Sequence, residues 1–244
     1  FCSWGNSSRE YRSRWMMRLA DAIDKYSKRL VLAESKDTGK PVWLAKKMDI
    51  PRASENFRFF ATEILHFSSK TYDSDGGALN YVLRQPIGVA GCISPWNLPL
   101  YLLTWKIAPA IAAGNTVVAK PSEITPYTAY LLGEICKEIK FPKGVINIVH
   151  GYGEVAGDAI VRGCDIVSFT GGTETGRKVA LRAAEEFKKC SLEMGGKNPT
   201  IIFRDSDLDL AIKQTIRSGF LNQGQICLCG SRVFVEKSIF KKFK

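Results

Sequence analysis

The spacing of apolar and polar residues predicts helices over the first quarter of the chain. Apolar residues recur with the period of a helix over residues 9–36, and Ser7 and Ser8 are suited to cap its start. A second helical pattern begins after Pro41 and extends to about residue 66. We expect this helix to kink or restart near Pro51, because a proline ring disrupts the interior of a helix.

Further along the chain, short apolar stretches alternate with helical patterns. Turn-forming residues at 73–77 precede a loosely alternating strand pattern at 79–84. Five apolar strands are then predicted, at residues 88–93, 116–119, 145–149, 166–169 and 190–193. The helices predicted between them cover residues 101–113, 126–140, 154–162 and 173–187. This alternation is typical of an α/β fold with a doubly wound, Rossmann-like parallel sheet.

The last part of the chain shows the same order of elements once more. A strand at 200–203, a helix at 208–220, a strand at 232–235 and the start of another helix are predicted there. The sequence therefore predicts a second α/β unit after the main sheet.

Composition and charge exclude several classes of protein. The 244 residues are 45% hydrophobic and 24% charged, as in a globular protein. A net charge of +11 suggests nucleic acid or membrane as a partner, but the lysines and arginines are scattered along helices rather than grouped with stacking aromatics. The apolar stretch at 85–119 contains four prolines and the charged Lys106, so it does not resemble a membrane span of about 20 apolar residues. We therefore expect neither nucleic acid nor membrane as a partner.

The cysteines and histidines argue against a disulfide framework and a metal site. Seven cysteines are irregularly spaced without a CxxC pair, which favours free thiols in a reducing compartment and hence a cytoplasmic protein. His66 and His150 are far from each other, and neither lies near a cysteine in the sequence. No metal is expected, because the usual spacing of zinc ligands is missing.

Polar or glycine-rich segments follow each of the five predicted strands. They occupy residues 94–99, 120–123, 151–153, 170–173 and 194–197. Ligands of a doubly wound sheet bind in the crevice beyond the carboxyl ends of its strands. The sequence therefore predicts a ligand site lined by these five segments.

Two glycine-rich segments are candidates for binding phosphate. The pattern Gly151-x-Gly153-x-x-Ala156-Gly157 follows a strand and opens a helix, as in a dinucleotide-binding fingerprint. The fingerprint also has an acidic residue at the end of the next strand, and this sequence has none there. A plain tight turn is therefore equally favoured. Gly171-Gly172-Thr173 also opens a helix, whose free N–H groups bind anions; a simple helix cap is the alternative.

Other residues offer the chemistry of a reaction site. Lys120 and Glu123 form either a ribose-binding pair or an exposed ion pair. Cys227 is either a nucleophile or an inert buried thiol, since a cysteine in apolar company is usually structural. A nucleophilic cysteine benefits from a nearby base. Glu193, at the end of a predicted strand, is better placed for that role than either histidine.

Five segments together resemble the aldehyde dehydrogenase superfamily, in its usual order. They are Ser94-Pro95-Trp96-Asn97, Lys120-Pro121-Ser122-Glu123, Phe169-Thr170-Gly171-Gly172-Thr173, Leu192-Glu193-Met194-Gly195-Gly196-Lys197 and Gly224-Gln225-Ile226-Cys227. The separations of 23 residues from Asn97 to Lys120 and 34 from Glu193 to Cys227 also match, and the likeness extends over essentially the whole chain.

The resemblance implies NAD-dependent oxidation of an aldehyde to a carboxylate. Cys227 would be the nucleophile, Asn97 an oxyanion donor, and Glu193 the base that activates the hydrolytic water. The residues that it implies for NAD binding are Ile93, Ser94, Pro95, Trp96, Lys120, Ser122, Glu123, Gly153, Gly157, Phe169, Thr170, Gly171, Gly172, Thr173, Met194 and Gly195.

A closer likeness is to the muconic semialdehyde dehydrogenase branch of that family. Residues 49–52, 56–60, 96–106 and 226–229 carry it. Members of the branch oxidise 2-aminomuconic or 2-hydroxymuconic semialdehyde in the kynurenine pathway of tryptophan breakdown or in aromatic-ring degradation. Arg52 is then our hypothesis for a contact with a substrate carboxylate, with a surface or helix-cap arginine as the alternative.

The resemblance also implies a domain organisation. Residues 1–67 would be the helical N-terminal part of the NAD-binding domain, 68–86 a hairpin used in homo-oligomerisation, 87–195 the Rossmann-like domain, and 196–244 the start of the catalytic domain. Family chains begin earlier and run on past this end, so we expect a fragment that is inactive by itself. A non-catalytic relative and an aldehyde dehydrogenase of broader specificity, acting on retinal or aliphatic aldehydes, remain as alternatives.

Overall fold

A five-stranded parallel sheet forms the centre of the protein. The computed structural model describes all 244 residues. The strands are β3 (Val89–Ile93), β4 (Thr116–Lys120), β5 (Ile146–Ile148), β6 (Ile166–Gly171) and β7 (Lys189–Met194). Their order is β5-β4-β3-β6-β7, and every neighbouring pair is parallel. The strand order therefore reverses between β3 and β6: the chain adds β4 and β5 on one side of β3 and then β6 and β7 on the other. The predicted doubly wound sheet is confirmed.

Helices pack on both faces of this sheet because alternate strand residues point to opposite sides. Ala90 and Cys92 belong to the larger apolar core, with helices α6 (Pro99–Ala112) and α7 (Tyr127–Glu138). Ile93 belongs to the smaller core, with α8 (Asp158–Gly163) and α9 (Thr173–Ala184). The predicted helix at 154–162 is split, since η2 (Gly153–Gly157) is a π-helical turn before α8.

The N-terminal helices cover the face of the larger core. They are α1 (Cys2–Gly5), α2 (Arg9–Lys25), α3 (Ser27–Thr38), α4 (Val42–Leu44), η1 (Ala45–Asp49) and α5 (Ile50–His66). The predicted cap is confirmed, since the Ser8 side chain accepts a hydrogen bond from the Tyr11 N–H at 3.1 Å. The predicted restart is also confirmed, because α5 begins at Ile50 with Pro51 in its first turn. The prediction of a single helix over residues 9–36 is wrong, because two helices, α2 and α3, occupy this stretch.

The helix over 9–36 is interrupted at Tyr26, which leaves the helical conformation with φ −92° and ψ 12°. The Tyr26 hydroxyl donates a hydrogen bond to Glu138 of α7. Tertiary contacts of this kind override a continuous helical pattern, which is a weak local preference. The break redirects α3, whose Leu30 and Val31 are buried in the larger core.

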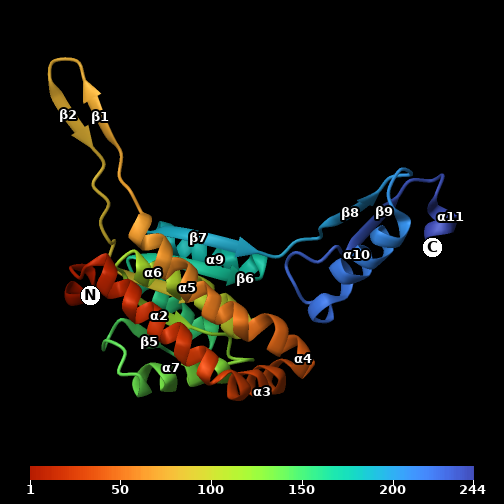
Figure 1. Cartoon of the computed structure of the whole chain (residues 1–244), viewed down its shortest axis with the longest axis horizontal. Helices are drawn as coiled ribbons and strands as arrows, with labels where there is room; N and C mark the ends of the chain where they lie inside the picture. Colours follow the sequence, from red (N-terminus) through yellow and green to blue (C-terminus); the bar gives the residue numbers. More distant parts are fainter.

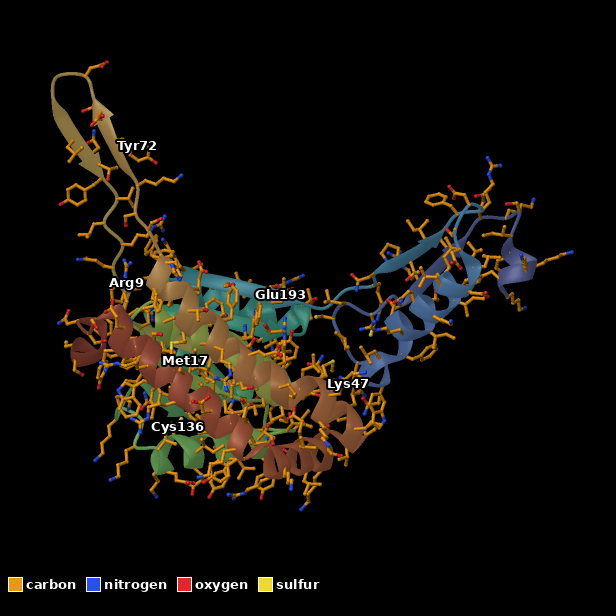
Figure 2. All side chains as sticks on the ribbon, viewed as in Figure 1. Arg9, Met17, Lys47, Tyr72, Cys136 and Glu193 are labelled. Carbon is orange, nitrogen blue, oxygen red and sulfur yellow. The ribbon has the colours of Figure 1, made fainter.

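Two smaller units project from the sheet (Figure 1). The antiparallel hairpin of β1 (Thr71–Ser74) and β2 (Ala78–Tyr81) is exposed along its whole length, and Figure 2 shows Tyr72 on it. The strand predicted at 79–84 ends at Tyr81, because β1 begins at Thr71 and leaves the later residues without a partner strand.

After β7 the chain forms a second α/β unit. Strands β8 (Pro199–Ile202) and β9 (Arg232–Val235) pair in parallel, and α10 (Leu208–Phe220), η3 (Leu221–Gly224) and α11 (Phe240–Phe243) complete it. These elements confirm the predicted order. None of the helices is long and apolar enough to cross a membrane.

Candidate functional site

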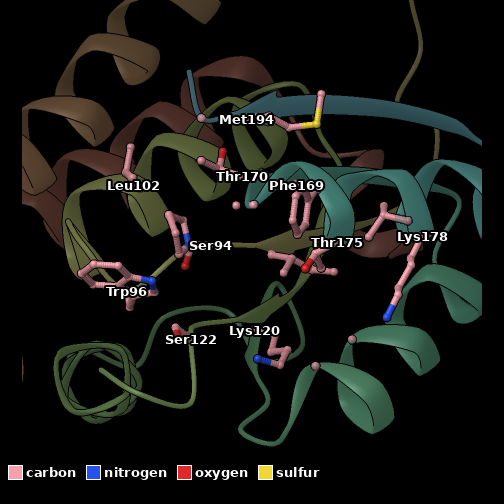
Figure 3. Close-up of a pocket in the computed structure, with 18 of the residues that line it drawn as sticks. Ser94, Trp96, Leu102, Lys120, Ser122, Phe169, Thr170, Thr175, Lys178 and Met194 are labelled. Atoms are coloured by element: carbon pink, nitrogen blue, oxygen red, sulfur yellow. The ribbon is translucent and has the colours of Figure 1, made fainter. Parts of the chain in front are cut away.

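A cavity of about 1350 Å³ opens beyond the carboxyl ends of β3, β4, β6 and β7. Figure 3 shows Ser94, Trp96 and Thr170 around it. All five predicted polar segments contribute to its wall, and the segment at 151–153 contributes Tyr152 and Gly153. The crevice predicted from the strand ends therefore exists, and it lies where the sheet order reverses, the usual ligand position in such sheets.

The residues predicted to bind the cofactor lie almost entirely in this wall. Those that line the cavity are Ile93, Ser94, Pro95, Trp96, Lys120, Ser122, Glu123, Gly153, Gly157, Phe169, Thr170, Gly171, Gly172, Met194 and Gly195. Thr173 is the exception. It begins α9 as an exposed residue and does not line the cavity.

Lys120 and Glu123 form an ion pair at one edge of the cavity. Lys120 Nζ lies 2.9 Å from Glu123 Oε2, and it also donates to the Pro121 carbonyl at 2.9 Å. The Lys120 side chain is 3% exposed, whereas that of Glu123 is 40% exposed. A hydrogen bond from its own backbone N–H and the Lys120 ammonium hold the pKa of Glu123 below its usual value. Glu123 is therefore a carboxylate that faces the cavity with one oxygen engaged.

Glycines shape the opposite wall. A Cβ atom on Gly171 would lie 2.5 Å from the Phe169 ring, and one on Gly176 would lie 2.6 Å from Met194 Sδ. Gly172 precedes α9 without any side-chain cap, so the first N–H groups of that helix are not satisfied by a capping side chain. This favours the anion-site interpretation of Gly171-Gly172-Thr173, since free N–H groups at a helix start bind phosphate.

A polar group without a protein partner also lines the cavity. Ser94 Oγ is buried and makes no hydrogen bond within the chain. The Ser94 backbone is fixed, because its N–H donates to the Lys120 carbonyl at 3.1 Å. Buried polar groups are normally satisfied, so an unpaired hydroxyl in a cavity wall indicates a ligand or a water that completes it.

The segment that carries Cys227 borders the same cavity. Gln225, Ile226 and Cys227 line it together with Asn97. The Asn97 side chain donates from Nδ2 to the Gln225 carbonyl at 2.6 Å, a contact between residues 128 positions apart. Asn198 Nδ2 donates to the Cys227 carbonyl at 2.7 Å. Two of the three predicted catalytic residues are therefore brought to one place.

Glu193, the third predicted catalytic residue, lies elsewhere. It is exposed near the end of β7 (Figure 2), opposite Thr170 of β6. It does not line the cavity. Its negative charge acts on Lys106. Burial lowers the pKa of Lys106 to about 8, and the charges of Cys92 and Glu193 oppose this decrease. Lys106 Nζ donates to Ser168 Oγ at 3.0 Å.

Arg52 lies in the first turn of α5, outside the cavity wall. Its guanidinium is 5.7 Å from the centre of the Tyr101 ring and 5.9 Å from that of Trp105, and Nη1 is 3.2 Å from Glu55 Oε2. The hydroxyl of Tyr101 and the carboxylate of Glu55 raise the pKa of Arg52. Its side chain remains 46% exposed, so it is available to a second anion.

Sequence reasoning missed one side of the cavity. The face of α9 contributes Thr175, Lys178, Val179 and Arg182, which are spaced as one helical stripe. That spacing after Gly171-Gly172 is a signal that could have predicted them. Other cavity residues without such a signal are Leu102, Ile124, Glu154, Asp158, Val161, Leu181 and Glu185.

Comparison with known proteins gives consistent results. Residues 1–244 match the aldehyde dehydrogenase family. The chain is 54% identical to 2-aminomuconic semialdehyde dehydrogenase of Danio rerio, covering 100% of this chain and 50% of that protein. It is 46% identical to 2-hydroxymuconic semialdehyde dehydrogenase of Pseudomonas sp. strain CF600, covering 98% and 51%. This chain thus spans about half the length of these relatives.

Among solved structures, betaine aldehyde dehydrogenase of Staphylococcus aureus, determined in complex with NAD+, superimposes with a TM-score of 0.94 at 39% identity. The match covers 98% of this chain and 48% of that one. Because this chain covers only about half of each relative and of the solved structure, those proteins contain elements beyond the ones described above.

Proposed function

Since the chain belongs to the aldehyde dehydrogenase family, we propose that it forms the NAD-binding cleft and the nucleophile segment of an enzyme that oxidises an aldehyde to a carboxylate. One observation supports this most strongly. Residues suited to hold a dinucleotide and the Asn97–Cys227 pair line a single cavity. Because the chain spans about half the length of its relatives, the activity is proposed for the full-length protein.

The cavity wall fits NAD. Ser94 Oγ offers an unpaired hydroxyl, and Gly171 and Gly172 present backbone without side chains. Lys120 and Glu123 would hold the adenosine ribose, and the start of α9 would hold the pyrophosphate. The Glu123 carboxylate would repel the 2′-phosphate of NADP, which favours NAD. When bound, the nicotinamide supplies the hydride acceptor.

The Cys227 thiolate would attack the aldehyde carbon and place negative charge on the former carbonyl oxygen. Two donors are suited to hold that charge. Asn97 Nδ2 has a second hydrogen beyond the one given to Gln225, and the Cys227 backbone N–H has no backbone partner. Each such donor is worth about 2.7–4 kcal/mol in the transition state. Loss of hydride from the same carbon leaves a thioester on Cys227.

Hydrolysis of the thioester needs a base that removes a proton from water, and we assign this role to Glu193. Because Glu193 lies outside the cavity wall, its carboxylate must approach Cys227 through a change in the β7 end or the segment that follows it.

We assign a muconic semialdehyde as the substrate class, with Arg52 as the contact for its carboxylate. The stacking of Arg52 on Tyr101 and Trp105 fixes the guanidinium, and a planar guanidinium binds carboxylate with two hydrogen bonds. The similarity to two muconic semialdehyde dehydrogenases supports this class.

The test is NADH formation by the full-length protein, followed by absorbance, with muconic semialdehydes and an uncharged aldehyde. We expect NADH with all of them. Arg52→Ala should raise KM for the muconic semialdehydes by at least tenfold and leave KM for the uncharged aldehyde within twofold. Equal changes for both substrates would contradict the role of Arg52, and the absence of NADH with every aldehyde would contradict the proposed activity.

A further inference from the structure

A fully buried ion pair lies next to Asn97. Lys40 follows α3 and Asp49 ends η1, and Lys40 Nζ is 2.7 Å from Asp49 Oδ1. Both side chains are 0% exposed. Burying two charges is costly unless the geometry is good and other hydrogen bonds are made, so such a pair needs an explanation beyond stability.

Lys40 contacts the backbone of the proposed oxyanion donor. Its Nζ donates to the Asn97 carbonyl at 3.2 Å. Asn222 Nδ2 donates to the same carbonyl at 3.0 Å. A carbonyl oxygen has two lone pairs, so both acceptor positions of Asn97 are occupied. The Asn97 backbone is therefore held from two directions while its side chain contacts Gln225.

The same lysine residue also contacts the nucleophile segment. In the amide orientation that satisfies its neighbours, the Gln223 side chain accepts from the Lys40 N–H at 3.2 Å and donates to the Asn222 carbonyl at 2.9 Å. Asn222 and Gln223 both have left-handed backbone, with φ of 52° and 57°. Such conformations are unfavourable for residues other than glycine and persist only when surrounding contacts impose them. Lys40 supplies one of these contacts.

A second buried acid, Glu34, completes the cluster and leaves it electrically balanced. Glu34 is 0% exposed, and neither carboxylate oxygen has a hydrogen-bond partner. Burial, with the Asp49 charge in addition, raises its pKa to about 8. Glu34 is therefore mainly neutral at pH 7, and Lys40 and Asp49 remain as one cation paired with one anion.

We propose that Lys40, anchored by Asp49, is a positioning residue that fixes Asn97 against the Cys227 segment. This inference rests on the proposed function, since Asn97 matters only if an oxyanion forms at Cys227. Oxyanion donors must be placed within fractions of an ångström, and a displacement of about 1 Å can reduce a rate by about 100-fold. Lys40 does not contact substrate. Its ammonium acts through the Asn97 carbonyl, whereas its contact with Gln223 is made by the backbone N–H, which a side-chain substitution leaves in place.

The role of Lys40 in positioning Asn97 can be tested separately from its effect on the stability of the fold. This is possible because buried ion pairs can often be replaced by apolar residues without loss of stability. Lys40→Met alone would leave Asp49 as an unpaired buried carboxylate and destabilise the fold. The double variant K40M/D49L removes both charges together. Arg58→Met is the matched control. It also removes a cation paired with acids, Asp21 and Asp24, but at the surface and away from the cavity.

The full-length protein is compared as wild type, K40M/D49L and R58M in three measurements: urea unfolding, NAD binding, and the rapid first-turnover formation of NADH. For K40M/D49L we expect stability and NAD Kd close to wild type and a first-turnover rate reduced about 10- to 100-fold. Amide exchange of residues 222–227 should become at least tenfold faster. R58M should match the wild type in all measurements. A K40M/D49L rate equal to wild type would overturn the inference.

If K40M/D49L does not fold, Asp49→Asn and Asp49→Ala give the test instead. The asparagine side chain still accepts a hydrogen bond from Lys40, so the first-turnover rate of the Asp49→Asn variant should stay within threefold of wild type. Alanine cannot accept that hydrogen bond, so the first-turnover rate of the Asp49→Ala variant should fall about tenfold or more. Equal rates in these two variants would overturn the inference. Wild-type and R58M proteins that form no NADH would instead contradict the proposed function itself.

Discussion

The sheet region and the C-terminal unit are held in place by different forces. In the sheet region, β4 residues Val117 and Ala119 and the α6 residue Leu103 are 0% exposed. In the C-terminal unit, α10 has no buried residue. The nucleophile segment is instead fixed by polar contacts, such as Asn97 with Gln225 and Asn222 with Asn97. Apolar burial thus positions the proposed cofactor wall, whereas hydrogen bonds position the proposed nucleophile.

This difference predicts which property each substitution changes. Substitutions in the sheet region should alter stability, because that region contains the buried apolar surface. Substitutions in the nucleophile segment should alter chemistry with little change in stability, because few apolar contacts are lost there.

The largest effect is expected at Cys227. Cys227→Ala removes the proposed nucleophile, so aldehyde oxidation should fall by about 10⁴-fold or more, in the range seen when a covalent nucleophile is deleted. NAD affinity and the free energy of unfolding should remain close to wild type, since Cys227 is only half-buried. Steady-state kinetics, NAD titration and urea unfolding measure the three quantities. A large loss of stability would contradict the division between the regions.

The next effect concerns Glu34 and pH. Its pKa is raised to about 8 in the folded protein from the usual 4.5, so the unfolded state ionises first as pH rises. Stability from neutral Glu34 is therefore complete below pH 4.5 and is lost between about pH 4.5 and 8. Glu34→Gln does not titrate and should remove this decline. The variant should be more stable than wild type at pH 8 by a few kcal/mol, at about 1.4 kcal/mol per pKa unit.

Urea unfolding at pH 5, 6.5 and 8 tests this prediction. The difference in unfolding free energy between Glu34→Gln and wild type should grow with pH. A difference that stays constant over this range would show that Glu34 is ionised in the folded protein or is not buried.

A matched pair of leucines compares the two regions directly. Leu103 of α6 is 0% exposed, and Leu210 of α10 is 53% exposed. Leu103→Ala should lower the free energy of unfolding by about 2–5 kcal/mol, because it leaves a cavity in a packed core. Leu210→Ala should change it by less than about 0.5 kcal/mol, as for other exposed positions. Similar losses in both variants would mean that the C-terminal unit is as well packed as the sheet.

Much of the sheet region could be predicted from the sequence because its signals are local. Strand patterns, turn glycines and polar residues after the strand ends each involve a few neighbouring residues, and they predicted both the sheet and the crevice. The break at Tyr26 has no local signal in the sequence, and the hydrogen bond found there joins Tyr26 to Glu138, 112 positions away.

The contacts around the nucleophile show the same limit. Lys40 and Asn97 are 57 positions apart, and Asn97 and Asn222 are 125 apart, so no local pattern relates them. The family resemblance indicated Asn97 and Cys227 but gave no indication of Lys40. It also does not explain why Glu193 lies outside the cavity wall, a placement that depends on how the chain continues from β7 into the C-terminal unit.

The smallest effect is expected at Glu123. Glu123→Ala removes a carboxylate that is 40% exposed and that is proposed to contact the adenosine ribose. NAD affinity should fall about tenfold, or about 1.4 kcal/mol, while NADP affinity falls less because the repulsion is lost. Titrations with both dinucleotides measure the change, and Glu63→Ala is a suitable control because it alters an exposed acid of α5 outside the cavity wall. An unchanged NAD affinity would place the ribose elsewhere.

The central claim is that Cys227 carries the reacting acyl group at the cavity that binds NAD. The most direct test is mass spectrometry of acid-quenched full-length Glu193→Gln protein after mixing with NAD and a muconic semialdehyde. This variant should accumulate the thioester because the proposed hydrolytic base is missing. We predict one acyl group on the peptide containing Cys227, formed only with NAD and in step with one NADH per site. NADH formation with no acyl group on Cys227, or with the group on Cys229, would contradict the claim.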